Sequence, residues 1–147
     1  MTRWLLGCLL MHELGAQLIP WAWWVPDFTL VGLILAVGQS PDRWWLFSGL
    51  AGLTTYAWAV RVPGPILISF LALGWVAHLV AKQWDATDPR VQYLVVGIAS
   101  ALMAIEALWL EDLWSPPLVG LAGARVLLTC LMVPLARQLL FKTGTVR

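Results

Sequence analysis

Apolar residues run along almost the whole chain in long blocks, and prolines separate one block from the next. Proline suits the first turn of a helix, where a backbone N–H lacks a partner, and it interrupts helix interiors. Five prolines or proline pairs stand just before an apolar block, and one further block opens the chain. This punctuation predicts six helices, over Trp4–Trp24, Asp27–Gly38, Arg43–Val60, Ile66–Ala81, Val91–Leu110 and Leu118–Phe141.

Three of the prolines directly follow a residue that can cap a helix, namely Ser40, Asp88 and Ser115. The side-chain oxygen of such a residue accepts a hydrogen bond from an unpaired N–H of the first turn. A membrane-spanning helix needs about 20 residues. The second block, 26–39 at its longest, is short and crosses a bilayer only if it includes flanking residues or if the bilayer thins locally. The pattern therefore predicts six crossings, or five.

The composition excludes several classes of protein. Apolar residues make up 61% of the 147 residues and charged residues 12%, and the formal net charge is +1. The mean hydropathy is +0.80. A soluble domain of this size cannot bury so much apolar surface, and the composition argues against a disordered chain, a disulfide scaffold and a nucleic-acid binder. We expect an all-α integral membrane protein, a compact bundle of six or five transmembrane helices over 1–147, without a soluble domain.

Basic residues divide unevenly between the two ends of the predicted bundle. Seven of the nine Lys and Arg fall on one side, Arg61 alone falls on the other, and Arg125 lies inside the last helix. The positive-inside rule then places both termini in the cytoplasm, provided that the helix count is even. All of the eleven Trp except Trp75 lie near predicted helix ends, as expected for an aromatic belt at the membrane interfaces.

Ionisable residues inside membrane helices are costly and are therefore candidate functional sites. Glu13 and Arg125 are predicted at similar depth, and Glu106 is shallower but within reach of an Arg side chain. We interpret these three residues as an intramembrane ion pair in which Arg125 ties the last helix to the first or the fifth. A proton- or substrate-coupling role, or contact of Arg125 with a partner protein, remains an alternative.

No catalytic or metal-binding pattern is visible in the sequence. His12-Glu13 lacks the second His four positions on that a zinc protease helix needs, because Ala16 stands there. His78 is the only other His, and Cys8 and Cys130 are isolated within apolar blocks, so we expect no metal and no cofactor. We expect that the protein is not an enzyme.

Small residues spaced four apart let helix backbones approach closely in lipid. They predict either a compact bundle or a groove for another protein's helix. Four such pairs occur: Ser48/Gly52, Gly32/Ala36, Gly97/Ala101 and Gly120/Ala124. The candidate surface for a partner helix comprises Ser48, Gly49, Gly52, Gly120 and Ala124.

Several short motifs follow one another in a recognisable order: Pro26–Leu30, Ser48–Leu53, Pro63-Gly64, Gly74-Trp75 and Leu127–Pro134–Arg137. This order resembles the MreD family, the small integral-membrane subunit of the bacterial rod-shape system. Two positions differ from the family pattern. Thr55 or Tyr56 stands where an acid is expected, and Arg125 stands where the last helix commonly has Asn.

The resemblance implies a non-catalytic scaffold in the bacterial inner membrane. It implies binding to the bitopic protein MreC, together with RodA and a class B penicillin-binding protein, in support of lateral peptidoglycan synthesis. It also implies a bundle similar to the substrate-binding subunits of energy-coupling-factor vitamin transporters. Such a vitamin-binding subunit is the alternative function, and a small proton-coupled carrier that uses Glu13, Glu106 and His12 is a further one.

Overall fold

The computed structural model describes residues 2–18, 25–58, 63–86, 88–110, 112 and 114–143. Within these ranges the chain is all-helical and has no strand, which confirms the all-α part of the predicted fold class. The helices are α1 (Thr2–Leu18), α2 (Phe28–Gln39), α3 (Trp44–Trp58), α4 (Pro63–Gln83), α5 (Pro89–Leu110) and α6 (Pro116–Thr143), and a 3-10 turn, η2 (Pro41–Arg43), joins α2 to α3.

Two of the predicted helix caps are tested by the structure. Asp88 caps α5, since its Oδ1 accepts the N–H of Arg90 at 2.8 Å. The prediction for Ser40 is wrong, because its side chain makes no cap hydrogen bond. Its backbone carbonyl accepts the N–H of Arg43 instead, at 3.1 Å. The chain forms a tight turn at this point, and the backbone satisfies the N–H that a cap would have bound.

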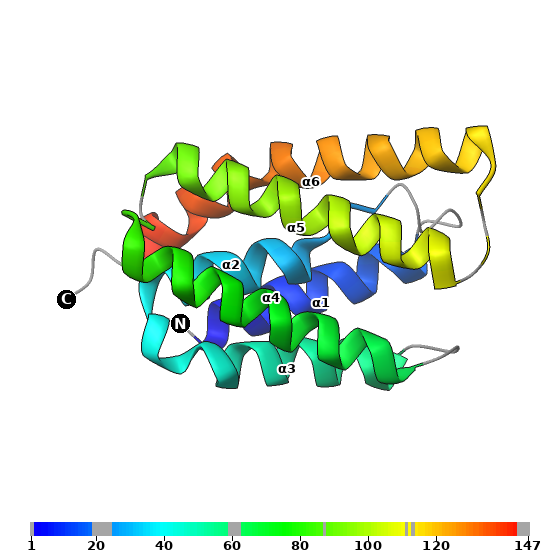
Figure 1. Ribbon diagram of the computed structural model, residues 1–147. Helices are drawn as coiled ribbons and strands as arrows, with labels where there is room; N and C mark the ends of the chain where they lie inside the picture. The colour runs from blue at the N-terminus through cyan, green and yellow to red at the C-terminus, as the bar shows by residue number, and fades with distance from the viewer. Residues whose placement is uncertain are drawn as a thin grey trace.

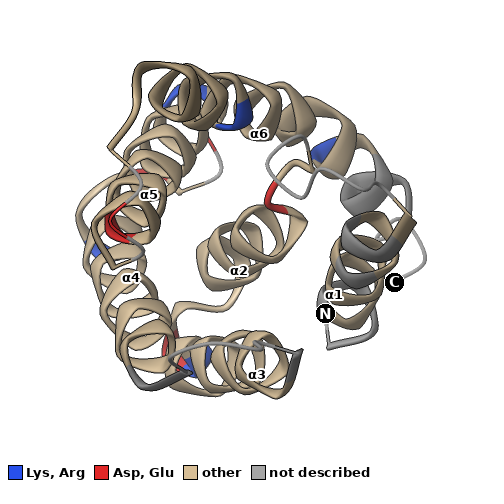
Figure 2. Cartoon of the chain, turned by 90° about the vertical axis from the view of Figure 1, so that its right-hand side faces the viewer, with Lys and Arg blue, Asp and Glu red and all other residues tan. Residues whose placement is uncertain are grey.

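Successive helices run in opposite directions along the bundle, so α1 begins and α6 ends at the same end (Figure 1). Seen from one end, α2 lies at the centre and the other five helices surround it (Figure 2). The hairpins α3–α4 and α5–α6 form most of this ring, and α1 packs against α2.

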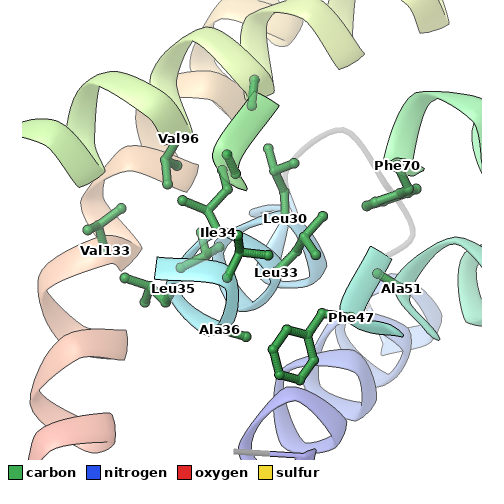
Figure 3. Close-up of a cluster of buried hydrophobic side chains, with 14 of the residues drawn as sticks. Leu30, Leu33, Ile34, Leu35, Ala36, Phe47, Ala51, Phe70, Val96 and Val133 are labelled. Carbon is green, nitrogen blue, oxygen red and sulfur yellow. The ribbon is translucent and has the colours of Figure 1, made fainter. Parts of the chain in front are cut away.

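The central helix α2 is buried around its whole circumference. Every residue from Thr29 to Val37 is buried. Its apolar side chains meet residues of each neighbouring hairpin (Figure 3), among them Phe47 of α3, Phe70 of α4 and Val133 of α6. A helix that is apolar on every side is stable only when it is enclosed, and α2 has no polar stripe to turn toward water.

The position of α2 also explains its length. Twelve residues extend about 18 Å at 1.5 Å per residue, whereas the hydrocarbon core of a bilayer is about 30 Å thick. Non-helical backbone at membrane depth is tolerated where protein encloses it. The ends of α2 therefore need not reach the membrane surface.

The outer helices carry apolar side chains outward. Exposed large residues include Leu10 on α1, Leu53 on α3, Ile98 on α5 and Leu127 on α6. Several buried residues, by contrast, are polar: Asp27, Thr29, Ser48, Gln92, Ser100 and Thr129. Three helices within the described residues are long and apolar enough to cross a membrane, over Pro65–Gln83, Pro89–Leu110 and Pro116–Gln138. The fold is therefore that of a helical, membrane-associated protein.

Candidate functional site

Polar groups gather at the N-terminal end of α2, where the chain enters the centre of the bundle. Asp27 precedes the first residue of α2 and is only 7% exposed. Its Oδ1 accepts the N–H of Leu30 at 2.9 Å, so Asp27 is the N-cap of this helix. A carboxylate at this position satisfies an unpaired donor and interacts favourably with the positive end of the helix dipole.

Helix α6 supplies two partners for Asp27. Arg125 Nη2 lies 3.7 Å from Asp27 Oδ2, and the two side chains are 25% and 10% exposed. One turn further along, Thr129 Oγ1 accepts the backbone N–H of Asp27 at 3.0 Å and donates to the carbonyl of Arg125 at 2.8 Å. The fully buried Thr129 hydroxyl thus uses both its acceptor and its donor, and the start of α2 is held against the middle of α6.

Helix α1 contacts the same point through His12. His12 Nδ1 lies 3.3 Å from the carbonyl oxygen of Pro26. A carbonyl oxygen only accepts hydrogen bonds, so His12 donates from a protonated Nδ1. His12, Pro26, Asp27, Arg125 and Thr129 form what we call the α2 entry network. It joins three helices at one buried point.

Among the described residues, Arg125 is paired with a carboxylate other than the predicted Glu106, whereas its pairing with Glu13 stays a prediction. The carboxylate beside Arg125 belongs to Asp27, whereas Glu106 Oε1 is hydrogen-bonded to Ser69 Oγ of α4 at 2.7 Å. As the first residue of the predicted helix Asp27–Gly38, Asp27 would lie at a membrane surface if that helix crossed the bilayer. Since α2 is short and central, Asp27 instead lies inside the bundle. Arg125 is nine residues beyond Pro116, about 14 Å along α6 at the rise of a regular helix. The side chain of Glu13 lies outside the described residues.

The sequence contained a signal for Asp27 that the interpretation missed. Asp27 follows a proline and stands three residues before Leu30, whose N–H it caps. When an entirely apolar helix is enclosed by others, an acidic N-cap residue at its start is buried with it. A buried carboxylate is costly unless a cation lies beside it.

The remaining candidates for polar chemistry lie elsewhere. His78 Nδ1 lies 2.7 Å from the Pro41 carbonyl, and its ring stacks at a tilt on Trp44, with centroids 5.9 Å apart. His78 thereby ties α4 to the 3-10 turn, away from His12 of the entry network. Among the described residues no three His, Cys, Asp or Glu side chains gather as a metal site would require.

Two of the residues predicted to bind a partner helix are used inside the chain, which corrects that prediction. Ser48 and Gly52 of α3 are buried against α4. A Cβ added at Gly52 would lie 2.8 Å from Leu67 Cδ1, and one added at Gly74 would overlap the Ser48 hydroxyl. The small residues therefore let α3 and α4 approach closely within the hairpin, so they do not face a partner.

Three of the predicted partner residues are less enclosed. A Cβ added at Gly49 or Gly120 would meet no atom within 4 Å. Gly49 is half-buried, Gly120 is exposed, and Ala124 is half-buried. On α6, Gly120 is followed along the outer face by Gly123, which also has open space, and by Leu127, which is 68% exposed.

No known family model, curated protein or solved structure matches this chain. The class of protein is therefore defined by the fold and the site: a helical, membrane-associated bundle whose central helix is anchored by a buried polar network.

Proposed function

We propose that the chain is a non-catalytic, multi-pass scaffold of the bacterial inner membrane, of the MreD type, that acts in the rod-shape system by binding the transmembrane helix of an MreC-like bitopic protein. The observation that carries this proposal is that polar side chains lie inside the bundle and apolar side chains lie outside, the reverse of a water-soluble protein. The polar groups of the entry network are used within the bundle, while apolar helix faces cover its outside. Such a protein interacts with others chiefly through helix faces in lipid.

The same proposal includes six crossings with both termini in the cytoplasm. Its support is the alternation of six helices, which brings the start of α1 and the end of α6 to one end (Figure 1). Arg43, Lys82, Arg90 and Arg137 all lie on helices or turns near that same end. A concentration of basic residues is typical of the cytoplasmic side.

We place the partner helix on the outer face of α6. A Cβ added at Gly120 or Gly123 would meet no atom within 4 Å. Ala124 is half-buried beside them, and Leu127 and Leu131 are exposed further along the same face. Small residues admit a second helix backbone, and the adjacent leucines supply contact area. RodA and a class B penicillin-binding protein would then join the assembly through the bitopic partner or beside it.

Co-purification in mild detergent tests this assignment. The chain is co-expressed with a tagged MreC-like protein, and the wild type is compared with Gly120→Leu and Gly49→Leu. Both substitutions place a large side chain where the bundle leaves open space, so both variants should fold and insert. We expect Gly120→Leu to lose the partner and Gly49→Leu to keep it.

The opposite pattern would move the partner site to α3. Retention of the partner by both variants would contradict a site at either position. Recovery of an ATPase module in place of a bitopic protein would favour the vitamin-transporter alternative over the scaffold.

A further inference from the structure

The side-chain amide of Gln92, in the first turn of α5, is buried, and only one of its two ends is hydrogen-bonded. Gln92 is 6% exposed. Its Nε2 donates to the carbonyl oxygen of Ala86 at 2.8 Å. Its Oε1 is buried and has no hydrogen-bond partner among the described residues, a state that it shares with Thr29 Oγ1 of α2.

The orientation of this amide is fixed by its neighbour. A carbonyl oxygen only accepts hydrogen bonds, so the amide nitrogen must face Ala86. If the amide were turned round, Oε1 would face the Ala86 oxygen and two acceptors would meet. The unpaired atom of Gln92 is therefore an acceptor. Burial of an acceptor is unfavourable unless a donor replaces the water that it loses, and nearly all buried polar groups have a protein or water partner.

Gln92, unlike Thr29, lines a small cavity of about 10 Å³ beside the connection between α4 and α5. Helix α2 packs against both α4 and α5, whereas α4 and α5 contact each other little, and the cavity lies where the three helices meet. Ile34 of α2, Ala77 of α4 and Ala86 of the connection also line it. The unpaired acceptor and the carbonyl that binds Nε2 thus belong to residues of the same cavity.

The size and the lining of the cavity select its occupant. A water molecule needs about 10–15 Å³ of open space and about two to four polar partners, and the cavity reaches the lower end of that range. Gln92 Oε1 can accept one hydrogen bond. The Ala86 carbonyl has a second lone pair beside the one that Nε2 uses, so it can accept another. An organic molecule is too large, and a metal cation would find too few oxygen ligands because most of the lining is apolar.

The cavity also lies near an end of the bundle, where water can reach it. Trp84 and Asp85 of the α4–α5 connection are exposed, and so is Gln39 at the end of α2. Gly38, which lines the cavity, is half-buried next to Gln39. A water molecule that enters here does not have to cross the apolar centre of the bundle.

We propose that this cavity is a binding site for one water molecule, which donates a hydrogen bond to Gln92 Oε1. The second proton of the water is available to the Ala86 carbonyl, so the water joins α5 to the connection that follows α4. It completes the packing around α2 at the end opposite to the α2 entry network. The inference does not depend on the scaffold function.

Water-edited solid-state NMR of the full chain in lipid bilayers tests the proposal. Magnetisation is transferred from water protons to the methyl groups of buried side chains. Ile34 and Leu35 are consecutive residues of α2 and are 5% and 2% exposed, but only Ile34 lines the cavity. We expect fast transfer to the Ile34 methyl groups and much slower transfer to those of Leu35. Transfer to Ile34 that is as slow as transfer to Leu35 would overturn the proposal.

Substitutions of Ala77 give an independent readout. Ala77 is 6% exposed and lines the cavity. Val and Thr have nearly the same shape, so Ala77→Val fills the cavity with methyl groups, whereas Ala77→Thr supplies a hydroxyl that can donate to Gln92. We expect Ala77→Val to lose the transfer from water to Ile34. We also expect Ala77→Thr to have a higher melting temperature than Ala77→Val, because only the hydroxyl pairs the buried acceptor.

Ala99 of α5 provides the matched control, since it is 3% exposed and does not line the cavity. There the Thr variant should melt no higher than the Val variant. Persistence of the transfer in Ala77→Val, or the same order of Thr and Val at both positions, would contradict a water site at Gln92. The comparison of Ile34 with Leu35 uses the wild-type chain, so it remains decisive even if a variant does not fold.

Discussion

The entry network offers a quantitative test of how α2 is held in place. Replacing Asp27 by Asn keeps a side-chain oxygen that can cap Leu30 but removes the negative charge beside Arg125. Breaking a buried ion pair by removing one partner costs about 3–5 kcal/mol. Arg125 is 25% exposed and lies 3.7 Å from the carboxylate, so solvent and distance weaken the interaction. We therefore expect a loss of about 2 kcal/mol for Asp27→Asn.

A double-mutant cycle isolates the pair. Arg125→Met removes the other charge and keeps an unbranched apolar side chain, and the double variant removes both. If the two charges interact directly, the double variant should lose less stability than the sum of the single variants, by about 1–2 kcal/mol. The free energy of unfolding is measured in bilayers or mixed micelles for all four proteins. Additive losses would refute the ion pair as the anchor of α2.

Matched cycles between Arg125 and the two other intramembrane acids complete this experiment. In Glu106→Gln with Arg125→Met, the losses should add, because Glu106 is bonded to Ser69 and Arg125 to Asp27. The same cycle with Glu13→Gln tests the pairing that the sequence suggested. A coupling in that cycle as large as that of Asp27 would identify a second anion at Arg125.

Two further predictions follow from the packing. Thr129→Val should lose about 1–3 kcal/mol of stability, because the buried N–H of Asp27 loses its acceptor. Thr129→Ser keeps the hydroxyl and should retain most of the wild-type stability. Denaturation curves of the two variants test this, and equal stability would contradict the hydrogen bond. Gly74→Ala should lower the free energy of unfolding by about 1–3 kcal/mol, because the added methyl group overlaps Ser48. Gly49→Ala should change it by no more than about 0.5 kcal/mol. Equal melting temperatures for these two alanine variants would show that α3 and α4 are not closely packed.

The polarity of the bundle bears on how such a chain avoids aggregation. Its outer faces consist of large apolar residues such as Leu10, Ile98 and Leu127. In water these faces would drive association, whereas in lipid they are solvated. The backbone N–H of Asp27, by contrast, donates a hydrogen bond to the Thr129 hydroxyl inside the bundle. Folding in the membrane therefore depends on a few specific polar contacts and on close packing, because apolar burial gives little advantage over contact with lipid.

The membrane character and the helices could be predicted because they depend on local features of the chain. Proline position, cap residues and block length act over a few residues, and they predicted a helix over Val91–Leu110 where the structure has α5 over Pro89–Leu110. The burial of α2 was also available in principle, because its sequence has no polar stripe at any angle around the helix. The Ser40 cap prediction failed for an equally local reason, since the N–H of Arg43 donates to the backbone carbonyl of Ser40 in the 3-10 turn.

The partners across the bundle were decided only by the tertiary structure. Which carboxylate faces Arg125 depends on the depth of α2 and on the rotation of α6, and neither can be predicted from the spacing of residues in the sequence. Likewise, Ser48 and Gly52 fit either a partner's helix or their own hairpin, and the placement of α4 settled that they pack internally. Helix formation is governed by neighbouring residues, whereas contacts between helices are governed by all the helices packed together, so sequence determines the elements of this protein and only the assembled bundle determines their pairings.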